Sequence, residues 1–247
     1  MNSLPRKDRR RFLEAAALGA VCAALAGLPL AARAARSAGA RMKIGIVGSG
    51  RVGGTLGEVW VKAGHQVMFS SLDIEHDRAL AARLGRNARA GSAREAAAFG
   101  DVVMVSVPYR ALRAVGRELG ALIRGKVVID TCNPFISRDG EIAAWARQKG
   151  VGLASAELLP GTRLVRAFNA IGYSSMGTAH EQPGRIGMPI ASDDAEAVAT
   201  ASRLIRDIGY EPVLVGGLAV GRHLMPGTAL AGEHTPDEIR RIAATLN

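Results

Sequence analysis

The stretch Lys43-Ile44-Gly45-Ile46-Val47-Gly48-Ser49-Gly50-Arg51-Val52-Gly53-Gly54 decides the fold of this chain. A short apolar run is followed at once by the pattern G-x-G-x-x-G and then by a segment with helical character. In that pattern Gly48 permits a tight turn, Gly50 lets the backbone approach a pyrophosphate, and Gly53 lets the helix pack closely on the sheet. Free amides at the helix start then face the phosphates. The stretch predicts a dinucleotide site, and its alternatives are a glycine-rich turn without a ligand or a flavin site.

Downstream, strand-like and helix-like segments alternate. The strand-like runs are apolar without alternation, as expected for strands buried on both faces of a parallel sheet. The predicted strands are Lys43–Val47, Gln66–Ser70, Asp101–Val107, Lys126–Asp130, Leu164–Phe168, Arg185–Ala191 and Pro212–Val215. The predicted helices are Val52–Ala63, Glu75–Leu84, Arg94–Phe99, Ala111–Ile123, Glu141–Lys149, Ala195–Ile208 and Pro236–Leu246. We therefore expect an α/β fold over residues 41–247, a Rossmann-type, doubly wound and mostly parallel sheet with a small C-terminal α/β extension.

The end of the second predicted strand indicates which nicotinamide dinucleotide the site prefers. NAD-binding proteins usually carry an acidic residue there, which binds the ribose hydroxyls. This chain has Ser70 and Ser71, whose hydroxyls can donate to a 2′-phosphate, so NADP is favoured over NAD. Against this, Leu72 stands where an arginine would suit a phosphate, and Asp73 offers a carboxylate to a ribose. Arg78 on the next helix is a candidate for the missing cation.

Two further strand ends suit a ligand, because ligands in such sheets lie beyond the carboxyl ends of the strands. The turns Val107-Pro108-Tyr109 and Asp130-Thr131-Cys132-Asn133-Pro134 each break a buried strand with a proline. We interpret Val107, Pro108 and Asn133 as cofactor contacts. The alternative is that these turns merely end their strands.

The first forty residues have the anatomy of a signal peptide. A basic segment, Arg6–Arg11, precedes an apolar run, Ala15–Leu30, and a small-residue region. Arg9-Arg10-Arg11-Phe12-Leu13 matches the twin-arginine export pattern, which predicts contact with that export machinery and a periplasmic or otherwise exported protein. Cleavage after Ala34 or Ala40 is expected, with Ala40 preferred. The alternatives are an uncleaved amphipathic anchor and translation from Met42, which would leave a cytoplasmic enzyme.

Charge and cysteine usage exclude several classes of protein. Residues 1–41 carry a net charge of +6, which leaves only +4 of the total +10 for the rest of the chain, so nucleic-acid binding is not expected. The apolar run of the leader is shorter than the roughly 20 residues of a spanning helix, so no permanent membrane span is expected. Cleavage would remove Cys22 and leave Cys132 without a disulfide partner, as a buried apolar group rather than a nucleophile. The oligomeric state stays open, and a homodimer is one candidate.

From Met42 onward the chain resembles the NADP oxidoreductase family that includes NADP-dependent reductases of the deazaflavin coenzyme F420. The resemblance rests on the glycine loop, Ser70-Ser71, Val105–Tyr109, Asp130–Pro134 and Leu164–Asn169. A similar domain occurs in six-transmembrane metalloreductases. The resemblance implies hydride transfer between NADP(H) and a flavin, deazaflavin or similar small acceptor near Ala167-Phe168-Asn169; a non-catalytic dinucleotide-binding or scaffold protein is the alternative. The predicted cofactor contacts are Gly48, Ser49, Gly50, Arg51, Val52, Gly53, Ser70, Ser71, Val107, Pro108, Asn133, Ala167 and Asn169.

No catalytic residue is predicted, since hydride transfer needs alignment of two rings more than acid–base groups. The sequence contains no Ser-His-Asp constellation, no metal-ligand spacing and no paired carboxylates in a motif. Its histidines are scattered singly at positions 65, 76, 180, 223 and 234. Only His180 and His223 fall in glycine-containing loops that should overhang the site.

Overall fold

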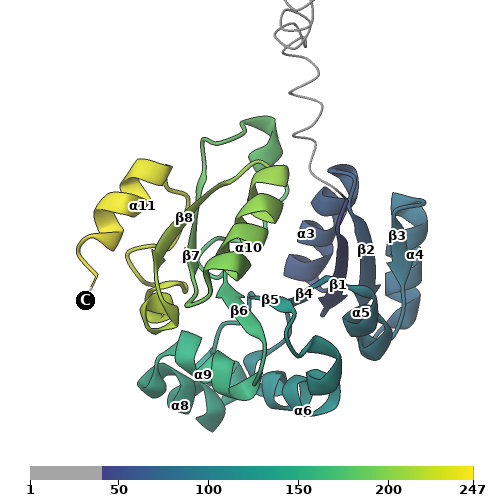
Figure 1. Cartoon of the computed structure of the whole chain (residues 1–247), viewed down its shortest axis with the longest axis horizontal. Helices are drawn as coiled ribbons and strands as arrows, with labels where there is room; N and C mark the ends of the chain where they lie inside the picture. Colours follow the sequence, from purple (N-terminus) through teal and green to yellow (C-terminus); the bar gives the residue numbers. More distant parts are fainter. Residues whose placement is uncertain (1–40, 247) are drawn as a thin grey trace, which may run out of the picture. The chain divides into compact units, whose positions relative to one another are not determined.

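A mixed sheet runs through the part of the chain that the computed structural model describes, residues 41–246 (Figure 1). Its strand order is β3-β2-β1-β4-β5-β6-β7-β8. The strands are β1 (Lys43–Val47), β2 (Gln66–Ser70), β3 (Ala88–Ala90), β4 (Val102–Val105), β5 (Val127–Asp130), β6 (Arg163–Arg166), β7 (Gly187–Ala191) and β8 (Glu211–Gly216). All neighbouring pairs in this sheet are parallel except β6 and β7, which meet antiparallel at Arg166 and Ala191.

The helices cover both faces of the sheet. The α-helices are α3 (Arg51–Lys62), α4 (Ile74–Leu84), α5 (Ala93–Phe99), α6 (Leu112–Ile123), α7 (Ile136–Asp139), α8 (Glu141–Lys149), α9 (Val151–Leu158), α10 (Ala195–Asp207) and α11 (Pro236–Ala243). Short 3-10 helices are η1 (Tyr109–Ala111), η2 (Ala179–Glu181) and η3 (Leu218–His223). The predicted doubly wound, mostly parallel α/β fold with a small C-terminal extension, formed here by β7, β8 and α11, is confirmed.

The two larger of three apolar clusters lie on opposite faces of the sheet and explain why the strands are apolar without alternation. On one face Ile44 and Ile46 of β1 pack with Trp60 of α3 and Leu204 of α10. On the other face Val103 and Val105 of β4 pack with side chains of α6 and α9. Figure 1 shows α3 and α10 side by side, apart from the group formed by α6, α8 and α9. Burial on both sides leaves the strand ends as the places where polar groups meet a ligand.

Several elements differ from the sequence-based expectation. Strand β3 has no counterpart among the predicted strands, since its three residues pair at the sheet edge without an apolar run. Helix α9 also has no counterpart among the predicted helices, because Gly152 near its start resembles a helix breaker. In the structure this glycine is needed for packing, since a Cβ there would lie 2.1 Å from the Leu218 carbonyl oxygen. Strand β6 ends at Arg166, before the predicted end at Phe168, because Phe168 adopts a φ of 65°. That left-handed backbone cannot continue a strand.

The predicted export leader, residues 1–40, and its cleavage sites lie outside the described residues. Within residues 41–246, no helix is both long enough and apolar enough to cross a membrane.

Candidate dinucleotide-binding site

The glycine loop between β1 and α3 has the geometry that its sequence predicts. Gly48 has a φ of 101°, and a Cβ on it would lie 2.2 Å from the Ser106 carbonyl oxygen. A Cβ on Gly53 would lie 2.0 Å from the carbonyl oxygen of Gly48, so the helix packs directly on the turn. Gly50 is different, because no heavy atom lies within 4 Å of the position of its Cβ. Gly48 and Gly53 are therefore required by the fold, whereas Gly50 leaves space beside the backbone.

The free amides of this loop belong to the first turn of α3. The Gly48 and Ser49 amides both donate to the Ser70 carbonyl oxygen at 2.9 Å, so the fold uses them. Helix α3 begins after Gly50, which has no side chain to cap it. The amides of Arg51, Val52 and Gly53 therefore lack both an intrahelical partner and a side-chain cap, as is general for a first helical turn. The positive end of the helix dipole lies at this turn, which suits a pyrophosphate.

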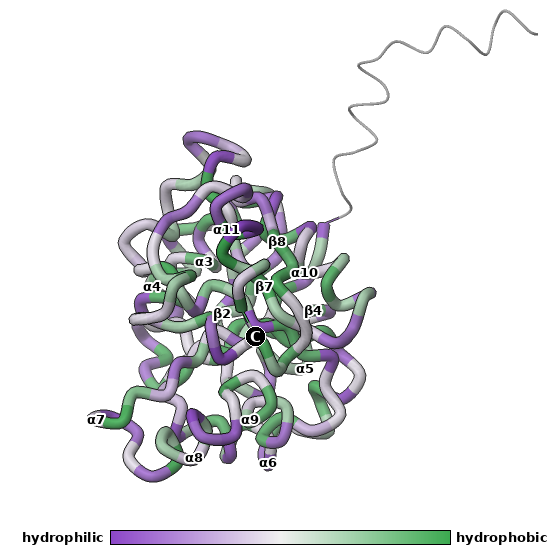
Figure 2. Tube along the Cα trace, turned by 90° about the vertical axis from the view of Figure 1, so that its left-hand side faces the viewer, coloured by the Kyte–Doolittle hydropathy of each residue, from purple (hydrophilic) through white to green (hydrophobic). Residues whose placement is uncertain are grey.

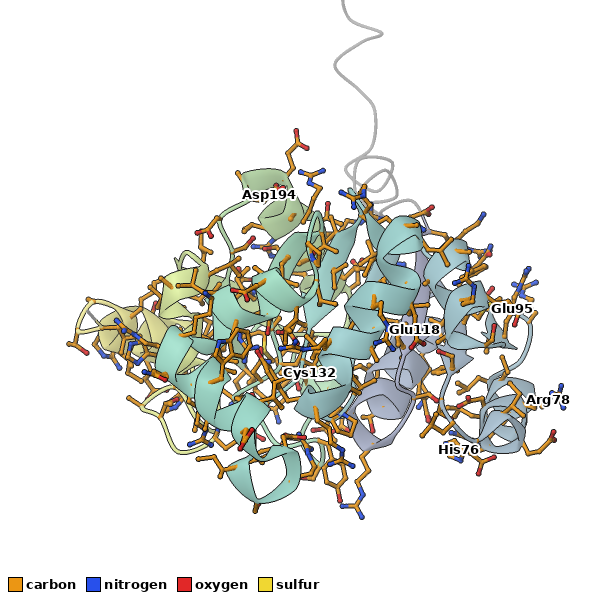
Figure 3. The ribbon with its side chains drawn as sticks, turned by 90° about the horizontal axis from the view of Figure 1, so that it is seen from below. His76, Arg78, Glu95, Glu118, Cys132 and Asp194 are labelled. Atoms are coloured by element: carbon orange, nitrogen blue, oxygen red, sulfur yellow. The ribbon has the colours of Figure 1, made fainter. Side chains whose placement is uncertain are left out.

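A cavity of about 790 Å³ opens beside this loop. Its wall includes Gly48 and Gly50, the tip of β2 from Ser70 to Asp73, Val107 and Pro108 after β4, and the helical segments Ser92–Arg94 and Ala111–Leu119 in part. The structure thus brings six of the predicted contacts, Gly48, Gly50, Ser70, Ser71, Val107 and Pro108, around one space. Seen from below in Figure 3, Glu118 on α6 lies between Cys132 and the outer group of Glu95, His76 and Arg78.

The two serines at the β2 tip differ in their availability. Ser70 is buried, and its hydroxyl donates to the Ile46 carbonyl oxygen at 2.7 Å, which holds the end of β2 against β1. The exposed Ser71 hydroxyl lies 2.9 Å from a carboxylate oxygen of Asp77. Asp77 itself is fully buried and also accepts a hydrogen bond from the Ser49 hydroxyl. The predicted hydroxyl contact to a 2′-phosphate therefore depends on Ser71.

The charged residues around the cavity differ in part from those that the sequence indicates. Arg78 pairs with Glu75 at 2.6 Å on the outer surface and does not line the cavity. Arg94 at the start of α5 and Arg110 on η1 do line it. Sequence reasoning misses Arg94, because its position depends on β3, which brings α5 beside the β2 tip. Leu72 stands at the cavity fully exposed.

A second cluster lies beyond the ends of β5 and β6, where the predicted contacts Asn133, Ala167 and Asn169 are found. These three residues are not part of the cavity wall. Asp130 and Arg166 form an ion pair of 2.6 Å in which both side chains are completely buried. Asp130 also accepts the Cys132 amide at 2.8 Å, and Arg166 donates to the Leu224 carbonyl oxygen at 3.2 Å. Sequence reasoning misses this pair, whose only signal is an acid and a base ending two neighbouring strands.

The backbone after β6 is held in an unusual conformation by this cluster. Phe168 is the non-glycine residue with a positive φ among residues 41–246, and its ring packs edge-to-face with Trp60 and Tyr210. The Asn169 side chain donates to the Asp130 carbonyl oxygen at 3.1 Å, and the Asn133 side chain donates to the Asn169 carbonyl oxygen at 2.7 Å. The cluster therefore fixes the turn Ala167–Asn169 from both sides.

Cys132 behaves as the sequence predicts. Cys132 is 2% exposed, and its thiol lies 3.5 Å from the Val105 carbonyl oxygen. Burial, reinforced by the Asp130 carboxylate, raises the pKa of the Cys132 thiol well above its usual value. A neutral, enclosed thiol is a packing group and not a nucleophile.

The suspected histidines stand at different places. His223 ends η3, next to Leu224, whose carbonyl oxygen accepts from Arg166. One His223 ring nitrogen lies 3.3 Å from the Arg222 side chain. His180 belongs to η2, and its side chain is not among the described groups. Buried His65 is structural, because its ring links Met42 to Asp207 across the molecule.

Comparison with known proteins agrees with this geometry. The family model described as "NADP oxidoreductase coenzyme F420-dependent" matches residues 43–134. The F420-dependent NADP reductase of Methanothermobacter thermautotrophicus is 30% identical over 195 residues, which cover 73% of this chain and 84% of that protein. Metalloreductase STEAP3 of Rattus norvegicus is 29% identical over 185 residues, 74% of this chain. The chain spans only 35% of the length of that metalloreductase.

A similar fold is present in a solved structure from Arthrobacter, that of a candidate F420-dependent NADP reductase. It superposes with a TM-score of 0.63 at 19% identity, covering 73% of this chain and 87% of the other. At this identity the likeness concerns the fold alone.

Proposed function

The chain belongs to the family of NADP oxidoreductases that depend on coenzyme F420, and on this premise we propose that it transfers hydride between NADP(H) and a flavin, deazaflavin or similar small acceptor. The observation that carries the proposal is the open position at Gly50, in a loop whose other glycines are fixed by packing. A side chain at Gly50 would meet no atom of the described structure, so packing does not require glycine at this position. A pyrophosphate placed on the first-turn amides of α3 would fill it.

Each part of the site has a task in this proposal. Gly50 and the amides of Arg51, Val52 and Gly53, with Ser49 behind them, hold the pyrophosphate. The cavity between the β2 tip, Val107–Pro108 and α6 receives the adenosine half. The turn Ala167–Asn169, together with Asn133, faces the nicotinamide end, because β4, β5 and β6 are neighbours and end at the same edge of the sheet. The bound dinucleotide supplies the hydride chemistry, and the chain supplies orientation.

The rigid turn after β6 suits an alignment role. Hydride transfer depends on holding two rings at a fixed separation, and a misplacement of about 1 Å can cost about a hundredfold in rate. The strained φ of Phe168 and the hydrogen bonds of Asn133 and Asn169 keep this backbone in one conformation. Exposed Phe135 and Ile136, at the start of the α7 segment that projects in Figure 2, and exposed Tyr173 offer apolar surface to an acceptor ring.

Cofactor identity is the first experiment. The purified full chain would be denatured to release any carried nucleotide, and the native chain titrated with NADP and with NAD. We expect NADP to bind more tightly than NAD and to be reduced or oxidised when flavins or F420 are supplied. Bound NADP without turnover on any acceptor would instead favour the non-catalytic dinucleotide-binding or scaffold protein. Dissociation constants above roughly 1 mM, weaker than about −4 kcal/mol, for both nucleotides would overturn the proposal.

A variant at the open position provides the matched test. Gly50→Val adds a branched side chain where nothing in the described structure opposes it, so folding should be retained. The added methyl groups would occupy the space assigned to the pyrophosphate. We expect binding of NADP to fall by about a hundredfold or more, a loss of roughly 3 kcal/mol, with an unchanged unfolding temperature. Unchanged affinity would show that the pyrophosphate lies elsewhere.

We also propose export by the twin-arginine route, for which the sequence of the leader is the support. Replacement of both Arg9 and Arg10 by Lys should abolish export. N-terminal sequencing of exported protein should find a start after Ala40, or after Ala34. Protein that begins at Met42 and stays in the cytoplasm would contradict the proposal.

A further inference from the structure

Arg94 is a cation in the cavity wall that forms no ion pair with a carboxylate of the described residues. It lies in the first turn of α5 and is exposed. We infer that Arg94 binds the 2′-phosphate of NADP, and that this residue, rather than any on the β2 tip, sets the preference for NADP over NAD. The inference rests on the proposed function, since it assumes that a nicotinamide dinucleotide occupies the cavity.

Sheet pairing brings Arg94 to the ribose end of the cavity. Strand β3 lies parallel to β2 with Ala90 opposite Phe69, and the Gly91 amide donates to the Phe69 carbonyl oxygen at 3.0 Å. The chain therefore leaves β3 beside the point where Ser71 leaves β2. Ser92–Arg94 and Ser71–Asp73 both line the cavity. A ribose placed at the β2 tip, as in other folds of this kind, lies between these two segments.

Charge pairing singles out Arg94 among the arginines near the cavity. Its Nη1 donates to the backbone carbonyl oxygen of Glu118 at 2.9 Å, which anchors the side chain without neutralising it. The carboxylate of Glu118 is paired with Arg117 at 3.0 Å instead. A guanidinium has five N–H donors, so most of those on Arg94 are left for a phosphate.

The other two arginines are already engaged. Arg110 donates to the Arg138 carbonyl oxygen at 2.8 Å and lies 3.8 Å from Asp139, so it is turned toward α7. Arg78 is paired with Glu75 outside the cavity. Among the described residues lining the cavity, Arg94 is thus the cation without a carboxylate in ion-pair distance.

The acidic residues of the wall explain why an arginine is needed here. Asp73 and Glu118 also line the cavity and would repel a 2′-phosphate. Asp73 is partly engaged, because it caps α4 by accepting the His76 amide at 3.0 Å. Leu72 contributes no charge at the tip. Without Arg94 the β2 tip would favour a ribose with free hydroxyls, as in NAD-binding proteins.

The experiment separates the 2′-phosphate from the rest of the ligand. The affinities of the full chain for 2′,5′-ADP and for 5′-AMP would be measured by calorimetry, in the wild type and in Arg94→Met, Arg94→Lys and Arg78→Met. We expect Arg94→Met to bind 2′,5′-ADP about tenfold to a hundredfold more weakly, as for loss of a charge-assisted hydrogen bond. Its affinity for 5′-AMP should not change. Arg94→Lys should recover part of the loss, and Arg78→Met should bind both ligands as the wild type does.

Two results for Arg94→Met would overturn the inference. Binding of 2′,5′-ADP as tight as in the wild type would show that the phosphate is held elsewhere. Equal weakening of both ligands would assign Arg94 to the adenosine or the 5′-phosphate. Failure of the proposed function is a separate result, because the wild-type chain would then bind neither NADP nor NAD.

Discussion

The two halves of the candidate site, the cavity beside the glycine loop and the cluster after β5 and β6, differ in their exposure to solvent. The half that we propose for the adenosine is an open cavity whose charged and apolar wall residues, such as Leu72 and Arg94, are exposed. The half that we propose for the nicotinamide is closed, with Asp130 and Arg166 completely buried and bonded to each other. An open half can accept a ligand on groups that are already in place. In the closed half, the charged side chains are not proposed to contact the ligand. They fix the backbone of the turn Ala167–Asn169, which is the part proposed to contact it.

Breaking the closed half should have the largest effect. Arg166→Met removes one partner of the buried ion pair and leaves the Asp130 carboxylate without its counter-charge. We expect the free energy of unfolding to fall by about 3–5 kcal/mol, the usual cost of an uncompensated buried charge. Chemical denaturation of the variant and the wild type measures this difference.

A partly exposed ion pair on the same strand supplies the control. Arg163 begins β6 and pairs with Asp194 at 2.7 Å, with both side chains about one-third exposed. Arg163 holds Asp194 through two nitrogens and also bonds Glu196, so Arg163→Met should cost about 1 kcal/mol. This is well below the loss expected for Arg166→Met, because solvent screens a partly exposed pair. Equal costs for Arg163→Met and Arg166→Met would mean that the closed half is not the rigid element described above.

The sequence reveals the open half better than the closed half. The glycine loop is a continuous motif in which each glycine has a local reason, so the roles of Gly48, Gly50 and Gly53 can be predicted from the sequence alone. Arg166 and Asp130 are 36 residues apart, and only the pairing of β5 with β6 joins them. The position of Arg94 beside the cavity is hard to predict for a similar reason, because the edge strand β3 that places it carries no apolar pattern. Residues whose role depends on the order of the strands in the sheet are therefore the ones that cannot be predicted from the sequence.

The inward turn of Ser70 illustrates another limit. Its position at the strand end is predicted correctly, but the direction of its hydroxyl depends on the Ile46 carbonyl oxygen of the neighbouring strand. Ser70 and Ser71 look equivalent in the sequence. In the fold Ser70 ends β2 and is buried against β1, whereas Ser71 lies just beyond the strand and is exposed.

Within the open half, folding and binding depend on different glycines. Gly48→Ala forces an L-residue to a φ of 101° and places its Cβ against the Ser106 carbonyl oxygen. We expect a loss of about 1–3 kcal/mol in the free energy of unfolding, the cost of a strained backbone conformation. Gly50→Ala meets no atom and should unfold like the wild type. Thermal unfolding of the pair checks this, and equal melting temperatures would show that the loop is not fixed as described.

The smallest expected effect is on the rate at which Cys132, in the closed half, is alkylated as pH rises. Because the folded state keeps the Cys132 thiol protonated, alkylation of Cys132 should stay slow above about pH 8.5, near which an ordinary thiol ionises. A cysteine placed in the open half by Leu72→Cys should react with an ordinary pH dependence, since Leu72 is fully exposed. Mass spectrometry of peptides after timed alkylation follows the two sites in one sample and separates both from Cys22.

The same raised pKa fixes the direction of a stability change. The unfolded chain releases the Cys132 proton near about pH 8.5 while the folded chain retains it, so the contribution of this group to stability is complete below that pH and declines above it. Cys132→Ser would ionise in neither state, and it should lose this alkaline decline while the rest of the pH profile is kept. Alkylation of Cys132 at the rate of Leu72→Cys would mean that the end of β5 opens to solvent, and the contrast between the two halves of the site would fail.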